Sequence, residues 1–256
     1  MKKIVFMTAA FAALMLTACK KEKSEQQPGT PGTPSAKVLK KITKTENGHT
    51  TVYNLTYDAS RLMTIKSADN TEFTNFTYDG SGNVLKVEET EYEFKNIYTY
   101  TYNNGLPVSG TFKSWQRHAG EPDELIEDNI LGYTITNNQV SKMHLNMTQA
   151  DEQMDFNLTY TNGNLTKVVS DGGMFPYTAT FTYGTKKAAF PKVYKYVLDQ
   201  AGFSLQFFGG NDMLTEVIDL PGNSFDVNMN MQYTYDAAGY VLTSNDGTTS
   251  LKFDYQ

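Results

Sequence analysis

The chain has 256 residues, with 22 basic and 28 acidic side chains, a formal net charge of −6 and 13% aromatic residues. An acidic chain without basic clusters is a poor binder of nucleic acid, and its aromatic content suits pleated sheets. The only cysteine, Cys19, excludes an intrachain disulfide, and the length fits one large all-β domain.

Residues 1–18 predict an export signal. Lys2 and Lys3 precede an apolar core from Ile4 to Leu16, which is too short to span a bilayer comfortably and is typical of a cleaved signal. Removal of the signal lowers the net charge to −8.

The signal ends in Leu16-Thr17-Ala18-Cys19, which resembles the bacterial lipobox. That resemblance implies cleavage before Cys19 and lipid attachment to it. The mature protein would then contact the membrane through its lipid, as an outer-membrane lipoprotein facing the periplasm or the cell surface. The alternative is a free thiol left by ordinary signal cleavage.

Residues 19–36 are expected to form the lipidated cysteine and a flexible tether, since the Pro/Gly/Thr run at 28–34 cannot pack a core. Residues 37–256 are expected to form a single repeat-built β domain. Within it an aromatic or aliphatic residue before a turn recurs mostly every 20 to 27 residues, which is the length of one hairpin. These markers are Tyr57, Tyr78, Tyr102, Ile135, Tyr160, Tyr183, Phe208, Tyr235 and Tyr255.

The strands before the turns alternate between two faces. In 97–102 three tyrosines share one side and two threonines the other, and 229–235 alternates likewise. After the turns, aliphatic residues are spaced by three, which predicts a β-bulge there or strands covered on both faces. The pairs are Leu62 and Ile65, Val84 and Val87, Leu165 and Val168, and Leu214 and Val217.

These patterns predict an all-β fold, an antiparallel meander of about nine hairpins that is strongly curved or closed into a flattened barrel. The alternative is an open sheet of one or two layers. A round barrel of about 16–18 strands would leave a lumen too wide for side chains to fill. Strands of roughly 8–9 residues are short for a membrane barrel.

Two segments, Tyr78-Asp79-Gly80-Ser81-Gly82-Asn83-Val84 and Tyr235-Asp236-Ala237-Ala238-Gly239-Tyr240-Val241, resemble the YD repeats of Rhs and teneurin proteins. The layout of a lipobox followed by tyrosine-rich hairpins is similar to a family of Bacteroidota lipoproteins of unknown function. That resemblance implies a porin-like antiparallel β fold and carries over no catalytic residue.

Motifs for chemistry are absent from the sequence. His49, His118 and His144 lack metal-ligand spacing, and neither a nucleophile elbow nor a phosphate-binding glycine loop occurs. The run Glu89, Glu91 and Glu93 is typical of a solvated or edge-guarding strand face. We therefore expect no catalytic residues, no metal site and no cofactor.

The best candidate for a ligand-binding loop is the long insertion between the third and fourth units. It holds the only tryptophan, Trp115, with Arg117, His118, Asp123 and Glu124. Long loops on a rigid sheet often carry function. The alternatives are a plain surface loop with Trp115 tucked into the sheet and a short capping helix over residues 123–131.

These features favour a lipid-anchored cell-envelope protein that is not an enzyme and binds a glycan, a peptide or an envelope protein. One alternative is a carrier or shell that encloses an apolar ligand. Another is a carboxylate-dependent glycoside hydrolase, which needs two carboxylates roughly 5–10 Å apart across a cleft.

Overall fold

The computed structural model describes residues 36–91, 93–172, 176–191, 210–222 and 227–256, and Lys37–Gln256 forms one compact unit. The predicted signal, Cys19 and nearly all of the tether lie outside the described residues. Within the described part of the chain, no helix has the length and hydrophobicity needed to cross a membrane.

The described elements are strands. They are β1 (Leu39–Glu46), β2 (His49–Asp58), β3 (Arg61–Ser67), β4 (Phe73–Tyr78), β5 (Val84–Glu91), β6 (Phe94–Asn103), β7 (Leu106–Gln116), β8 (Glu124–Thr136), β9 (Gln139–Met147), β10 (Glu152–Thr161), β11 (Asn164–Gly172), β12 (Thr178–Lys187), β13 (Asn211–Asp219), β14 (Val227–Asn230), β15 (Gln232–Tyr235), β16 (Val241–Asn245) and β17 (Thr249–Tyr255).

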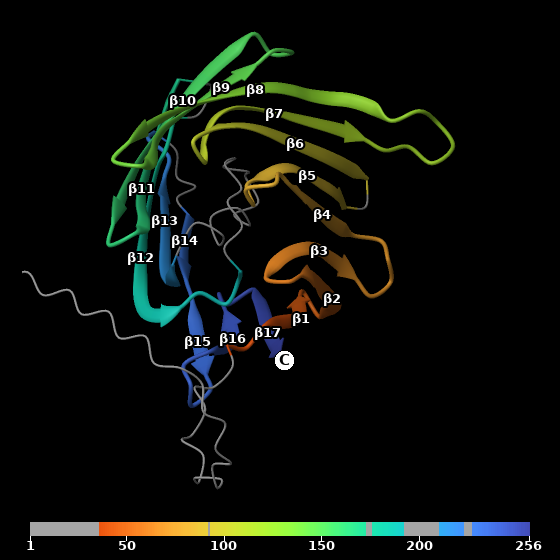
Figure 1. The fold of residues 1–256 in the computed structure, drawn as a ribbon, viewed down its shortest axis with the longest axis vertical. Helices are drawn as coiled ribbons and strands as arrows, with labels where there is room; N and C mark the ends of the chain where they lie inside the picture. The colour runs from red at the N-terminus through yellow and green to blue at the C-terminus, as the bar shows by residue number, and fades with distance from the viewer. Residues whose placement is uncertain (1–35, 92, 173–175, 192–209, 223–226) are drawn as a thin grey trace, which may run out of the picture. The chain divides into compact units, whose positions relative to one another are not determined.

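The strands form one antiparallel sheet that is nearly closed into a barrel (Figure 1). Neighbours in sequence pair with each other, and β1 pairs with both β2 and β17. β14 pairs with β13 and β15 with β16, so these two short strands continue one another across Met231. The predicted fold class is confirmed. The described count is 17 strands, and the expected marker Phe208 lies outside the described residues.

A β-bulge follows the turn in seven hairpins. Thr77 pairs with Lys86 but Tyr78 pairs with Val84, which leaves Leu85 as the extra residue. The same register shift occurs at the other markers, namely Tyr57, Tyr102, Ile135, Tyr160, Tyr183 and Tyr235. The extra residue places side chains that are three positions apart, such as Val84 and Val87, on the same face of the sheet. The bulge predicted from this spacing is confirmed.

One aliphatic pair was assigned one residue too late. Tyr183 pairs with Met213, so Leu214 is the extra residue of that bulge. Met213 and Glu216 therefore take the positions on the buried face. Leu214 and Val217 are each 36% exposed, so the predicted bulge is present at this hairpin but the aliphatic pair does not lie on the buried face.

The two faces of the sheet differ in chemistry. Aromatic and aliphatic side chains, such as Tyr98, Leu131 and Phe253, form the buried face. Phe190, in the chain that turns inward after β12, packs edge-to-face on Phe253 at 5.6 Å, so this face lines the inside of the barrel (Figure 1). The outside carries cross-strand hydroxyl pairs, including Thr56–Thr64, Thr99–Thr111, Thr182–Thr215 and Thr234–Thr243.

In five hairpins a tyrosine hydroxyl bonds to the strand before it. Tyr78 donates to the carbonyl of Leu62 at 2.6 Å, and Leu62 is the first inward residue of the preceding strand. Equivalent bonds of 2.7 Å run from Tyr57 to Leu39, from Tyr102 to Val84, from Tyr183 to Leu165 and from Tyr233 to Met213. The recurring tyrosine thus supplies both an apolar ring and a donor that satisfies a backbone carbonyl near the bulge.

The two most similar repeat segments form the same turn. The Asp79 carboxylate accepts the N–H groups of Ser81 and Asn83, and its own N–H donates to the carbonyl of Asn83. Asp236 repeats these contacts with the N–H groups of Ala238 and Tyr240 and with the Tyr240 carbonyl. An aspartate that satisfies turn N–H groups with its side chain accounts for the acidic residue after the tyrosine.

Candidate functional site

The predicted ligand-binding loop is the end of a long hairpin. Trp115 belongs to β7 and Glu124 begins β8, so only residues 117–123 connect the strands. The register runs through the expected insertion, with Trp115 opposite Leu125. A capping helix over 123–131 is wrong, because this segment pairs as a strand.

The five predicted residues lie along this hairpin end without converging. Trp115 is half-buried, and the Lys95 ammonium lies 5.7 Å from its ring centroid. Arg117 donates its backbone N–H to Glu93. His118 Nε2 lies 3.7 Å from Glu124 Oε2, both exposed, and Asp123 is exposed. Their role in binding stays a prediction.

Acidic and histidine side chains do not gather into a metal site. His144 Nδ1 lies 2.7 Å from Asp155 Oδ1 on the outer face, where Lys142 pairs with the same carboxylate. Over the described ranges, no group of three or more His, Cys, Asp or Glu side chains could hold an ion.

Among the described residues two carboxylates are buried, and both belong to β13. Asp212 accepts hydrogen bonds from the Tyr235 hydroxyl and the Lys186 N–H. Glu216 is 6% exposed, forms no hydrogen bond with another described residue, and burial raises its pKa. Their Cα atoms lie four residues apart along the strand, a span of about 13 Å. Asp212 lines a small cavity with Phe190 and Phe253, and Glu216 does not line it.

A cleft of about 250 Å³ lies where the first and last strands meet, and we call it the seam cleft. The ends of β1 and β2, the start of β16 and the end of β17 form one side. The chain that follows β12, from Lys187 to Pro191, forms the other. Three tyrosines line the cleft: Tyr57, Tyr240 and Tyr255.

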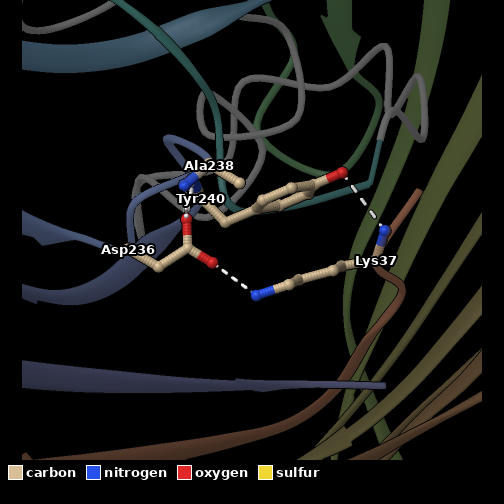
Figure 2. A network of polar contacts seen from close by, with 4 residues as sticks. All are labelled: Lys37, Asp236, Ala238 and Tyr240. Atoms are coloured by element: carbon tan, nitrogen blue, oxygen red, sulfur yellow. Dashed lines mark hydrogen bonds and ion pairs between the residues drawn. The ribbon is translucent and has the colours of Figure 1, made fainter. Parts of the chain in front are cut away.

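A polar network fixes one edge of the seam cleft (Figure 2). Lys37 donates its backbone N–H to the Tyr240 hydroxyl at 3.1 Å, and its ammonium pairs with Asp236. The same ammonium lies 5.5 Å from the Tyr240 ring centroid. The hydrogen bond from Lys37 lowers the pKa of Asp236, and the N–H groups of Tyr240 and Ala238 lower it further. The negative charge of Asp236 is therefore balanced by Lys37, and its carboxylate is held in place by the two turn N–H groups.

Tyr255 departs from the pattern of the other repeat tyrosines. Its hydroxyl is buried and has no hydrogen-bond partner among the described residues. The ring packs edge-to-face on Tyr240 at 5.4 Å. Burial raises the pKa of Tyr255, and the nearby Asp236, Tyr240 and Tyr57 raise it further. The hydroxyl consequently stays protonated at neutral pH, on the wall of a cleft.

Two further lysines lie at the cleft. Lys187 is an exposed lining residue and forms no ion pair with another described residue. The Lys40 ammonium lies 5.0 Å from the centroid of the Tyr57 ring, which also lines the cleft. The charge of Lys37 is balanced by Asp236.

Sequence reasoning did not find the seam cleft. Tyr57 and Tyr255 were recognised only as repeat markers, and Lys37 only as the start of the domain. The available signal was that Tyr255 is a marker without a following turn. Pairing of β1 with β17 brings these residues together, and no local pattern encodes that pairing.

Comparisons with known proteins give a fold and no activity. No described protein family matches the sequence, and no curated protein matches it. A porin-like protein from Bacteroides uniformis is 16% identical, with a TM-score of 0.53 over 85% of this chain and 96% of that one. A porin-like protein from Bacteroides vulgatus is 12% identical, with a TM-score of 0.56 over 85% and 98%.

At these identities the likeness shows the fold alone. The two Bacteroides structures are matched over almost their whole length, so the nearly closed antiparallel sheet is a shared architecture. A match to a TcdB2-TccC3-Cdc42 structure has a TM-score of 0.21 and covers 13% of that chain, and no argument rests on it. The resemblance to YD repeats therefore stays a prediction.

Proposed function

We propose that this protein is a lipid-anchored component of the cell envelope that binds a glycan in the seam cleft and catalyses no reaction on it. The observation that carries the proposal is the seam cleft itself, which the side chains of Tyr57, Tyr240 and Tyr255 line. Aromatic rings in a cleft are surfaces on which a sugar ring can stack.

A sugar fits the chemistry of the cleft better than an apolar molecule does. Tyrosine rings offer flat apolar surfaces, and their hydroxyls offer polar contacts at the edges. The volume of about 250 Å³ is just below the usual range for small-molecule sites of roughly 300 Å³ or more. One or two sugar rings at the end of a chain match this size better than a long peptide.

The outer face of the barrel supports a domain that faces water. A lipid-facing barrel carries an apolar band, and a lysine or arginine near the bilayer midplane costs roughly 2–4 kcal/mol. This barrel instead carries hydroxyl pairs and ion pairs such as Lys113–Asp128 and Lys142–Asp155. Membrane attachment would then depend on the lipid at Cys19.

The carrier alternative is less well supported. The cavity beside Phe190, Asp212 and Phe253 has a volume of about 40 Å³, which is enough for ordered water but not for an apolar ligand. The hydrolase alternative is also less well supported, because neither the small cavity nor the seam cleft is lined by both buried carboxylates.

The lipid anchor is tested first. Cells expressing the full chain should incorporate labelled palmitate into it and retain it in the membrane fraction, whereas Cys19→Ala should abolish both. Labelling that persists in Cys19→Ala would overturn the anchor.

Glycan binding is tested with the Cys19→Ala protein on a glycan array. Tyr255→Ala should abolish the signal, because it removes one aromatic wall of the cleft. Trp115→Ala is the matched control, since it removes an aromatic side chain at the hairpin end predicted from sequence. Loss of binding in Trp115→Ala alone would move the site to that hairpin. An array without signal, or binding to peptides only, would refute the glycan proposal.

A further inference from the structure

All of the bulges that follow a marker residue lie at one end of the barrel. Because neighbouring strands run in opposite directions, the turns after the markers share this end, and Lys37 and Gln256 lie there too. We call this end the bulge rim and the opposite end the far rim. The extra residues of the bulges are Met63, Leu85, Val108, Ser141, Thr166, Leu214 and Leu242.

Most of these extra residues are apolar although they are accessible to water. The two leucines and the valine that flank the seam most widely, together with Leu242, are 36–45% exposed, and Met63 is partly exposed. Neighbouring strands are about 4.8 Å apart, so residues on alternate strands lie about 10 Å apart around the barrel. One continuous series, which we call the rim arc, runs from β13 through the seam to β7 and consists of Leu214, Leu242, Val38, Met63, Leu85 and Val108.

The fold does not require an apolar residue at the bulge. Ser141 and Thr166 take the same position in the hairpins outside the rim arc, and each donates its hydroxyl to a carbonyl of the preceding strand at 3.2 Å. A leucine or valine at this position gives up that hydrogen bond and leaves an apolar side chain in water. A series of such residues is typical of a surface that contacts another molecule or a membrane.

Acidic residues are distributed unevenly between the two rims. At the bulge rim the acidic residues of the described turns are Asp79 and Asp236, and turn N–H groups bind both carboxylates. Lys186 and Lys187 are exposed at this rim. A bilayer with anionic lipids would attract the bulge rim and repel the far rim. In the described connections of the far rim, the acidic residues are Asp69, Glu72, Glu93, Glu121, Asp123, Asp151 and Asp246, with Arg117 as a basic residue among them.

The chain also enters the domain at the bulge rim. Lys37 follows the tether directly, so a lipid on Cys19 would bring this rim to the bilayer first. The spacing of the rim arc suits a membrane better than a protein partner. A stable protein interface buries a continuous patch of roughly 800 Å² on each side, whereas a fluid bilayer surface can accept separate apolar side chains.

From the charge, the entry point and the spacing we infer that the rim arc inserts into the surface of the lipid bilayer that holds the Cys19 anchor. The barrel then rests on the membrane by this side of its bulge rim. The inference rests on the lipid anchor of the proposed function and adds a second, non-covalent membrane contact. The seam cleft lies at the same rim, so in this orientation it faces sugars carried at the membrane surface.

The test measures how residues 37–256 partition onto vesicles, because this unit is compact by itself and carries neither the signal nor the anchor cysteine. Flotation with vesicles of phosphatidylcholine and phosphatidylglycerol gives the partition coefficient. Leu85→Ser combined with Leu242→Ser should lower it by about tenfold or more, because two apolar side chains no longer enter the bilayer. Serine fits these positions, since Ser141 occupies the equivalent bulge.

Leu125→Ser combined with Ile130→Ser is the matched control, because both are exposed apolar residues of β8 that lie away from the bulge rim. This pair should leave the partition coefficient unchanged. The inference is overturned if the parent does not float with the vesicles, if the rim-arc pair binds as the parent does, or if the control pair loses as much. It is also overturned if sedimentation shows that the parent dimerises and that only the rim-arc pair is monomeric, since the arc would then contact a second copy.

Failure of the vesicle test can be separated from failure of the proposed function. Palmitate labelling reports on Cys19 and the glycan array on the seam cleft, and neither depends on Leu85. A protein that is labelled and binds sugar but does not partition onto vesicles would keep its proposed function and lose only the inferred contact of the rim arc.

Discussion

The tyrosine bonds to the preceding strand make a stability prediction that separates two tyrosines of the same repeat. Tyr78→Phe keeps the ring but deletes the 2.6 Å bond to the Leu62 carbonyl. Loss of one such bond costs about 1 kcal/mol. For a domain of this size, that lowers the melting temperature by about 2–4 °C.

Tyr255→Phe removes a hydroxyl that has no hydrogen-bond partner among the described residues, so the free protein should lose no stability. The paired comparison therefore isolates the hydrogen bond from the ring. A double variant, Tyr78→Phe with Tyr183→Phe, should lose about 2 kcal/mol, because the two hydroxyls bond to different strands and distant effects add.

Thermal and urea unfolding of the Cys19→Ala protein, followed by far-ultraviolet circular dichroism, would measure these differences. Two outcomes would contradict this prediction: a Tyr78→Phe protein as stable as its parent, or a Tyr255→Phe protein that loses as much stability as Tyr78→Phe. Either result would mean that the tyrosines stabilise the sheet through their rings alone.

Three further predictions concern the barrel. Burial raises the pKa values of Tyr57 and Tyr78 from 10.0 to about 12, so the unfolded chain releases these protons first. Stability should therefore be fully present below pH 10 and fall as pH rises towards 12, seen as a falling unfolding midpoint. Glu216→Gln should raise stability at pH 7 by about 1 kcal/mol, because it removes an unpaired buried acid, and the gain should disappear near pH 4. Gly110→Ala should cost about 1–3 kcal/mol in urea unfolding, since a Cβ there would lie 2.6 Å from the Thr99 carbonyl oxygen.

Each of these has a result that contradicts it. A midpoint that stays level from pH 10 to 12 would show that the tyrosines ionise without unfolding. A Glu216→Gln protein with no gain at pH 7 would mean that this carboxylate is satisfied. Gly132→Ala is the control for Gly110→Ala, because its Cβ would meet only the Cβ of His144 at 3.7 Å, and equal losses would exclude the steric explanation.

Much of the barrel was predictable because strand alternation and bulge position depend on residues that are close together in the sequence. Alternation predicted which residues of 97–102 share a face, and the spacing of Val84 and Val87 predicted the bulge that Tyr78 opens; which face lies inside became clear only from the structure. The pair Leu214 and Val217 was misplaced because Phe208 was taken as the marker residue before this strand. The residue that pairs across the sheet is Tyr183, which lies opposite Met213, so Met213 and not Leu214 takes the first inward position of the bulge.

The candidate site was less predictable because it depends on contacts between distant parts of the chain. Trp115 is the only tryptophan in the sequence and suggested a binding loop, but residues 124–128, which were assigned to that loop, begin the strand β8. The seam cleft requires Lys37 and Tyr255 to meet, and no pattern in either segment specifies its partner.

The two ends of the domain lie side by side, so its strands can be reordered along the chain by circular permutation. Val38 and Gln256 exchange two backbone hydrogen bonds, of 2.8 and 2.9 Å. A short linker could join these ends, and new ones could be opened at an exposed turn such as Asn104–Gly105 without removing a strand pair. Because β1 also pairs with β17, consecutive hairpins follow one another around the barrel without a break. In such a circular permutant the seam cleft would persist, but the residues that line it would no longer lie at the two ends of the domain.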